Sequence, residues 1–194
     1  MDFGNRLMGR MYTTYLARLH SSKRLAARGQ IWNIALISLT SASLLASIGT
    51  LTDADLFGPQ SSTVLLCLTA AATVLSLAVS ALDYSGRSRS AKSNYLKVQR
   101  LSCELELVLE TTPGEVNLSA FSDRYHEILS ESENQSNADY WNVCEHRDYR
   151  GWKHFRGHRP HLKLIQGFVT YAPLIVIAVP VAILYRLASW ALDG

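Results

Sequence analysis

The chain has 194 residues, of which 48% are hydrophobic and only 18% are charged, whereas soluble proteins average roughly 25% charged residues. Three cysteines and five prolines exclude a disulfide scaffold and a collagen-like repeat, and the apolar content excludes a disordered chain. The net charge of +3 favours no particular partner, so the distribution of charge along the chain is more informative.

The first segment, residues 1–30, has the pattern of an amphipathic helix. Apolar side chains recur at helical spacing from Met8 to Ala26, with arginine and lysine between them. This helix either lies on the anionic inner surface of a membrane, or faces a protein core and continues directly into the next element. We favour the second interpretation because no residue before Gly29 breaks the helix.

Two uncharged runs of about 20 residues follow, at 31–51 and 63–82. With a rise of ~1.5 Å per residue, each run matches a hydrocarbon core ~30 Å thick. A small soluble core has no room for two such runs, and a soluble hairpin would need an unusually large partner. A short polar loop with Asp53, Gly58 and Pro59 joins them. Residues 31–82 are therefore predicted to form a transmembrane hairpin.

Each of these two spans carries hydroxyl side chains at spacings of three and four residues, which places them along one face of a helix. They are Thr40, Ser43, Ser47 and Thr50 in the first span and Thr69, Thr73, Ser76 and Ser80 in the second. The hydroxyls either support close helix packing or line a water-filled path, which one hairpin is too thin to enclose. Packing is favoured on physical grounds, although both roles can coexist. Neither span contains an ionisable residue, which argues against a pump or secondary transporter and is compatible with a poorly selective pore.

The segment 83–163 is rich in charge and is predicted to be helical. Residues 83–111 continue the second span and carry a short heptad seam, whose positions are Ala91, Asn94, Val98, Leu101, Leu105 and Val108. This seam pairs with the N-terminal helix or with other subunits. Further helices are predicted over 118–131 and 139–152. Acidic residues dominate 104–145 and basic residues dominate 146–163, so mutual attraction is favoured over a lipid-surface patch and over nucleic-acid binding.

A third apolar run, within residues 164–190, contains Pro173 and Pro180. We prefer a third transmembrane helix to a re-entrant or interfacial one. Basic residues flank the hairpin and the third run but are absent from the hairpin loop, so the positive-inside rule places the N-terminus and 83–163 in the cytoplasm. Seven basic residues are candidates for contact with membrane lipids: Arg24, Arg28, Arg87, Arg89, Arg156, Arg159 and Lys163.

No segment has the pattern of a catalytic or metal centre. His154 and His158 are four residues apart, but Gly157 and Pro160 disrupt a helix there, and no glutamate stands as in a zinc-protease motif. There is no nucleophile elbow or phosphate-binding glycine loop. We therefore expect no enzyme activity, no catalytic or metal-binding residues, and no cofactor.

The layout resembles the SLATT family of two-transmembrane effector domains of bacterial conflict systems. The resemblance lies in the basic helix YLARLHSSKRLAARGQ, the span entry IWNIAL and the helix DYSGRSRSAKSNYLKVQRLSCELELVL. The segment YHEILSESENQSNADYW resembles the reverse-transcriptase-associated branch, with Tyr125, Asn134, Asp139 and Tyr140 as its signal-sensing motif. That branch has histidine where this chain has Gln135.

The resemblance implies a homo-oligomeric, pore-forming or membrane-disrupting effector of an antiviral, abortive-infection system. Its cytoplasmic helices would gate it in response to a reverse transcriptase or a nucleotide-signal-producing partner. The alternative is a non-conducting anchor or scaffold that recruits a cytoplasmic partner. In either case the sequence predicts an all-α integral membrane protein with a transmembrane hairpin, cytoplasmic helices extending from it, and a third C-terminal membrane helix. The resemblance implies that the membrane is the bacterial inner membrane.

Overall fold

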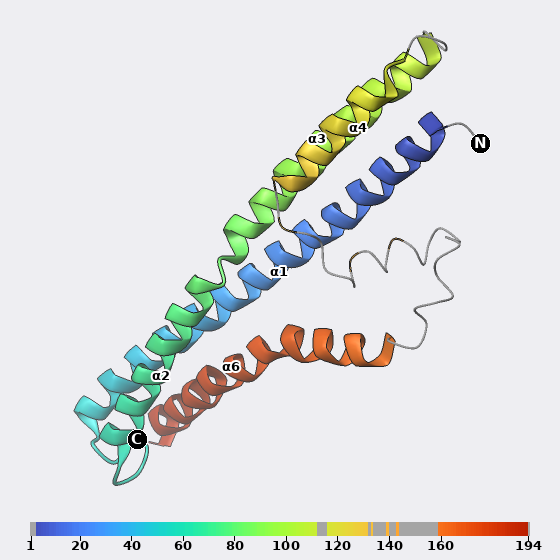
Figure 1. Cartoon of the computed structure of the whole chain (residues 1–194). Coiled ribbons are helices and arrows are strands. Elements are labelled where there is room, and N and C mark those ends of the chain that lie inside the picture. The colour runs from blue at the N-terminus through green and yellow to red at the C-terminus, as the bar shows by residue number, and fades with distance from the viewer. Residues whose placement is uncertain are drawn as a thin grey trace. The chain divides into compact units, whose positions relative to one another are not determined.

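The computed structural model of the chain describes residues 3–111, 116–131, 133, 139, 143 and 159–193. Every regular element among them is a helix (Figure 1): α1 (Phe3–Thr52), α2 (Ser61–Ala81), α3 (Tyr84–Thr111), α4 (Leu118–Ser130) and α6 (Arg159–Asp193). Three helical segments of the described chain, which contain α1, α2 and the Tyr171–Leu192 part of α6, are long and apolar enough to cross a membrane. The prediction of an all-α chain with a C-terminal membrane helix is confirmed.

Helix α1 is a single helix of 50 residues. At 1.5 Å per residue it is roughly 75 Å long, more than twice the hydrocarbon thickness of a bilayer. It contains no proline, so the N-terminal helix continues directly into the first apolar run, as the favoured interpretation expects. The chain divides into two compact units. Unit 1 is Met1–Ala26 with Ser85–Leu162, and unit 2 is Ala27–Tyr84 with Lys163–Gly194.

The connection between α2 and α3 differs from the expected continuous helix. Leu82 and Asp83 interrupt it, and Asp83 has a φ of 38°. This is the left-handed region, which aspartate tolerates better than most residues. The backbone N–H of Asp83 donates to the carbonyl of Ser80 at 3.1 Å, which tightens the last turn. The interruption falls beside the residue where unit 2 gives way to unit 1.

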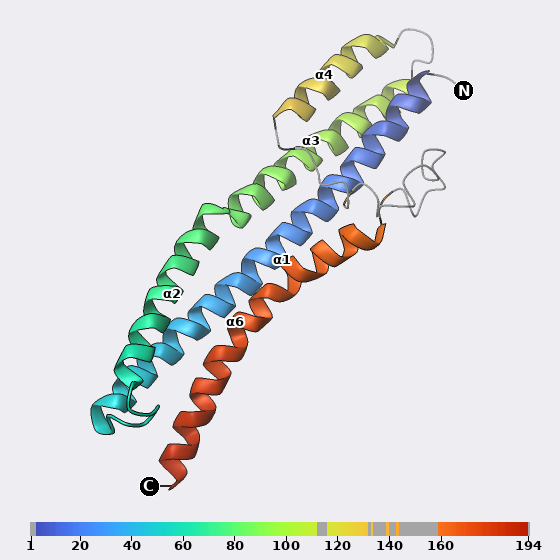
Figure 2. The same ribbon diagram turned by 60° about the horizontal axis from the view of Figure 1, so that its bottom comes forward.

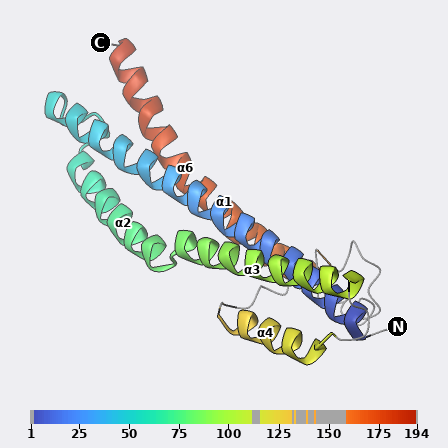
Figure 3. The ribbon, with the colours of Figure 1, turned by 90° about the horizontal axis from the view of Figure 1, so that it is seen from above.

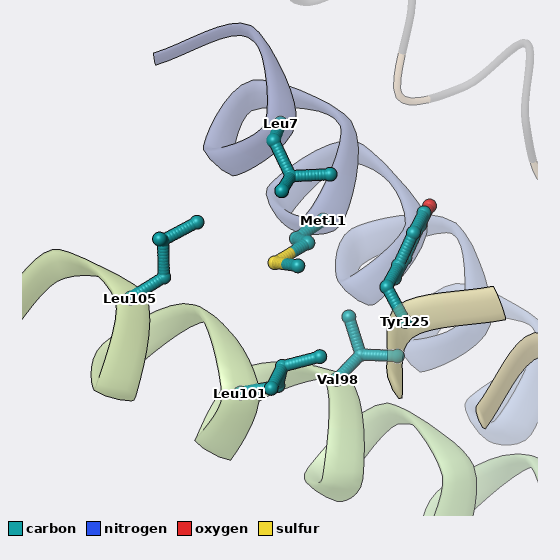
Figure 4. Packing of buried hydrophobic residues seen from close by; sticks show 6 residues of the cluster. All are labelled: Leu7, Met11, Val98, Leu101, Leu105 and Tyr125. Atoms are coloured by element: carbon teal, nitrogen blue, oxygen red, sulfur yellow. The ribbon is translucent and has the colours of Figure 1, made fainter. Parts of the chain in front are cut away.

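The core of unit 1 lies between α1, α3 and α4. Figure 4 shows Leu7 and Met11 of α1 facing the side chains of α3 and α4. The six buried residues of this cluster are Leu7, Met11, Val98, Leu101, Leu105 and Tyr125. Four of the six heptad-seam positions, Asn94, Val98, Leu101 and Leu105, are buried. The seam of α3 therefore packs against the N-terminal helix of the same chain, one of the two partners that the sequence left open.

Helix α4 lies beside α3 (Figure 3) and closely matches the helix predicted over 118–131. It begins where the Asn117 side chain accepts a hydrogen bond from the backbone N–H of Ala120 at 3.1 Å, an N-cap contact. Only Asp139 and Val143 are described from the helix predicted over 139–152, and both are helical. The rest of that prediction lies outside the described residues.

Helix α6, which belongs to unit 2 from Lys163 onward, is continuous through Pro173 and Pro180 (Figure 2), whose side chains are less than 2% exposed. Its C-terminal end meets the loop between α1 and α2. There the Trp190 indole donates to the Asp53 carboxylate at 3.2 Å, and Arg186 Nε donates to the Leu56 carbonyl at 3.3 Å. A helix of 35 residues does not turn back on itself, so its form favours a third crossing over a re-entrant segment.

Candidate functional site

A groove of about 450 Å³ separates α1 and α2 within unit 2. Its lining consists of Thr40, Ser43, Leu44, Ser47, Thr69, Ala72, Thr73, Ser76 and Leu77. Six of the eight hydroxyl residues singled out from the sequence are among them, whereas Thr50 and Ser80 are not. The spacing of three and four residues aligns the hydroxyls on each helix, and the packing of unit 2 turns the two hydroxyl faces toward a common space.

Four of the six groove hydroxyls donate hydrogen bonds to carbonyls of their own helices. Thr40 donates to the Leu36 carbonyl, Ser47 to the Ser43 carbonyl and Thr73 to the Thr69 carbonyl, each at 2.9 Å. Among the described residues, no hydrogen bond of these hydroxyls crosses from α1 to α2. The hydroxyl oxygens keep lone pairs that can accept further hydrogen bonds, so the groove surface can still bind water or another polar group.

Ser43 is a buried hydroxyl of this groove that makes no such bond. Its side chain is 3% exposed, and its Oγ has no hydrogen-bond partner in the part of the chain that the structure describes. A buried hydroxyl without a partner costs about 1–3 kcal/mol. The wall of the groove therefore contains a polar atom that a water molecule entering the groove, or a polar group of another subunit, would satisfy.

Two residues of the predicted signal-sensing motif contact α1 in unit 1. The Tyr125 hydroxyl lies 2.6 Å from Thr14 Oγ1. Asp139 is 2% exposed and accepts from Arg24 in two places, Nε to Oδ1 at 2.9 Å and Nη2 to Oδ2 at 2.6 Å. This is the bidentate fork that gives arginine–carboxylate pairs their strength. The other two motif residues, Asn134 and Tyr140, lie outside the described residues.

Arg18 is a buried cation on the face of α1 that meets α4. It is 2% exposed, and its Nη2 donates to the carbonyl of Leu129 in the last turn of α4 at 3.3 Å, where a positive charge also complements the helix dipole. Removal from water lowers the pKa of the Arg18 guanidinium below its ordinary value. Sequence reasoning missed both Arg18 and Thr14. The available signal was the heptad spacing of Arg18 from the core residues Met11 and Leu25 on α1.

The seven candidate lipid-contact residues have different surroundings. Arg24 pairs with Asp139, and Arg87 Nε donates to Glu133 Oε2 at 3.0 Å. Arg28 is half-buried and Arg89 is exposed. The side chains of the remaining three, Arg156, Arg159 and Lys163, lie outside the description. Acidic residues of the segment 104–145 thus pair with basic residues of α1 and α3. From the sequence we expected them to attract the basic segment 146–163, and that expectation did not include these partners.

The described side chains contain no group of three or more His, Cys, Asp or Glu residues that could hold a metal ion. The predicted histidine pair, His154 and His158, lies outside the described residues. Cys67 and Cys103 are exposed free thiols. The polar chemistry of the described chain is therefore that of the hydroxyl groove in unit 2 and of the charged contacts around α4 in unit 1.

Comparison with known families finds a match over most of the chain. The model of the SMODS and SLOG-associating 2TM effector domain family 5 matches residues 2–186. The chain belongs to this family. No curated protein and no solved structure matches the chain. Family membership supports a membrane-associated effector role in conflict systems, and the described helices add a third potential span to the two that the family's description counts.

Proposed function

We propose that this SLATT-family chain is a homo-oligomeric, pore-forming effector of an antiviral, abortive-infection system in the bacterial inner membrane. In this proposal the N-terminus and residues 83–163 are cytoplasmic, because basic residues flank the spans on that side and the hairpin loop has none. Its partners are membrane lipids, further copies of the chain, and a reverse transcriptase or nucleotide-signal-producing enzyme. The effector acts without catalysis, cofactor or nucleic-acid binding.

The hydroxyl groove is the observation that carries this proposal. Polar side chains are rare on lipid-facing surfaces, and they usually face a protein interface or a water-filled cavity. The groove gathers six hydroxyls from two spans, and Ser43 Oγ lacks a partner within the described chain. Because one hairpin cannot enclose a path, several copies would turn their grooves toward a common axis. Water in that path would satisfy Ser43.

Gating follows from the way α1 is shared between the two units. The same helix carries the contacts with α3 and α4 before Ala26 and the groove residues from Thr40 onward. A signal that rearranges unit 1 therefore acts on a helix that also forms the groove. To shift a population from 1% to 99% open, the signal must favour the open state by ~5.5 kcal/mol. Several polar contacts between α4 and α1, multiplied over the subunits, can supply a difference of this size.

Leakage measurements on groove variants test the proposal. Ser43→Leu and Thr73→Leu place apolar bulk in the groove, so both should abolish dye leakage from vesicles that contain the full-length protein. They should also abolish membrane depolarisation in cells that produce it. Ser80→Leu is the matched control, because Ser80 is an exposed hydroxyl on α2 that does not line the groove. Unchanged leakage in the groove variants, or equal loss in the control, would contradict the proposal.

A non-conducting anchor that recruits a cytoplasmic partner is the second candidate function. One observation favours it: Thr40, Ser47 and Thr73 already donate hydrogen bonds to carbonyls of their own helices, as hydroxyls do in ordinary packed spans. An anchor would tolerate leucine at Ser43 and Thr73 as long as the protein still enters the membrane. Growth arrest that persists in these variants without depolarisation would support the anchor.

A further inference from the structure

Three acidic residues that follow α4 each pair with a basic residue of α1 or α3, all within unit 1. They are Glu131, Glu133 and Asp139. The pairs are Lys97–Glu131, Arg87–Glu133 and Arg24–Asp139. These three carboxylates thus form ion pairs with basic residues of two different helices, although each carboxylate is more than 30 residues from its partner in sequence.

The Arg24–Asp139 pair has the geometry of a formed anion site. Asp139 is 2% exposed and the Arg24 side chain 26% exposed, so the contact is largely shielded from water. The Arg87–Glu133 pair is open, with side chains 43% and 71% exposed. A guanidinium that binds a carboxylate through two parallel hydrogen bonds also fits two oxygens of a phosphate. The chain's own carboxylates therefore occupy positions that phosphate groups could take.

The position of these arginines in the sequence indicates which phosphate they would meet. Arg24 precedes the uncharged run that begins at Ile31 by seven residues of one continuous helix, about 10 Å along its axis. Arg87 follows the end of the second run, Leu82, by five residues. Both arginines therefore belong to the short stretches that leave the apolar spans, where phospholipid headgroups lie. Lys97 is fifteen residues beyond Leu82, and its pair with Glu131 falls outside this zone.

We propose that Arg24 and Arg87 form a binding surface for anionic phospholipid headgroups, and that Asp139 and Glu133 occupy it in the state described here. The Arg24 guanidinium, engaged by Asp139 through two hydrogen bonds, cannot bind a phosphate in the same way, and Glu133 occupies the Nε of Arg87. Docking of these carboxylates therefore competes with headgroup binding. The inference rests on the proposed function and deepens it. Anionic lipid becomes a competitor for the contact that holds Asp139 against α1.

Retention of lipid by the purified full-length protein tests this competition. Native mass spectrometry with added phosphatidylglycerol or phosphatidylcholine measures the lipid that stays bound. Asp139→Asn and Glu133→Gln should each raise phosphatidylglycerol retention by about fivefold, the effect of one released arginine near an anionic headgroup. Phosphatidylcholine retention should not change. Adding Arg24→Gln to Asp139→Asn should remove the gain.

Asp123→Asn is the matched control, since Asp123 is an exposed carboxylate on α4 and its loss changes the net charge equally. A gain in this control as large as in Asp139→Asn would overturn the proposal, as would unchanged retention in both test variants. Binding of inorganic phosphate with no preference between the two lipids would also overturn it. Glu133→Gln changes an exposed pair, so it keeps the test valid if Asp139→Asn fails to fold. Lipid retention does not depend on conduction, so its failure is distinguishable from a failure of the leakage test.

Discussion

The contact between Tyr125 and Thr14 allows a quantitative test of how α4 is held on α1. The two hydroxyl oxygens are 2.6 Å apart, and the Tyr125 side chain is 6% exposed. Tyr125→Phe removes one hydroxyl and leaves the ring among its apolar neighbours. The same change leaves the half-buried Thr14 hydroxyl without this partner.

The expected effect follows from the burial of the pair. A hydrogen bond of this kind contributes about 0.5–1.5 kcal/mol net. Because Tyr125 is almost fully buried, we expect the Phe variant to lose about 1 kcal/mol, which corresponds to about a fivefold shift of α4 toward its undocked state. Thr14→Val removes the other hydroxyl with little change of shape and should cost a similar amount.

Hydrogen exchange of the α4 amides in the full-length protein measures this shift. The two single variants and the double variant form a cycle, and the loss in the double variant should fall short of the sum of the single losses by about 1 kcal/mol. Tyr95→Phe is the control, because the Tyr95 ring packs edge-on against Tyr15 and its hydroxyl makes no hydrogen bond within the described chain. Additive losses in the cycle, or equal loss in Tyr95→Phe, would refute the reasoning.

Two further predictions concern the core of unit 1 and the direction of the third helix. Leu101 is 1% exposed in the cluster of Figure 4, so Leu101→Ala should lower the free energy of unfolding of unit 1 by about 2–5 kcal/mol. Leu107→Ala changes a side chain that is 61% exposed on the same helix, so it should change this free energy by less than about 0.5 kcal/mol. Thermal unfolding monitored by circular dichroism compares the two variants. Similar shifts of the unfolding transition in both would contradict the packing described. The second prediction uses Leu192→Cys in a Cys67→Ser background. Its new thiol should react with a membrane-impermeant maleimide added outside intact cells, because α6 ends at the hairpin loop. Labelling only after lysis would contradict a third crossing.

Local patterns in the sequence were sufficient to predict most of the helical architecture. Apolar runs at 31–51 and 63–82, and a third within 164–190, indicated helices of membrane-spanning length, and the structure has them. The heptad spacing on residues 83–111 predicted which face of α3 is buried. These are properties of one helix at a time. Length, charge and periodicity along a helix depend only on neighbouring residues, so they can be read without knowledge of the fold.

Local patterns also indicated the hydroxyl faces but could not show how those faces meet. Spacing alone grouped Thr50 and Ser80 with the other hydroxyls, whereas the groove excludes both. The reason is that spacing defines only which face of one helix carries the hydroxyls. The rotation of α1 against α2 decides which residues of that face line the groove. The lack of a partner for Ser43 Oγ likewise depends on that rotation.

Contacts between distant parts of the chain were beyond any local pattern. Arg24 and Asp139 are 115 residues apart, and the sequence offered Arg24 many carboxylates, as well as lipid phosphates, as partners. The left-handed turn at Asp83 also has no local signature. Charge attracts over a distance without selecting a partner, so the selection came from apolar packing of α4 on α1 and α3, which brought one particular carboxylate within reach of each arginine.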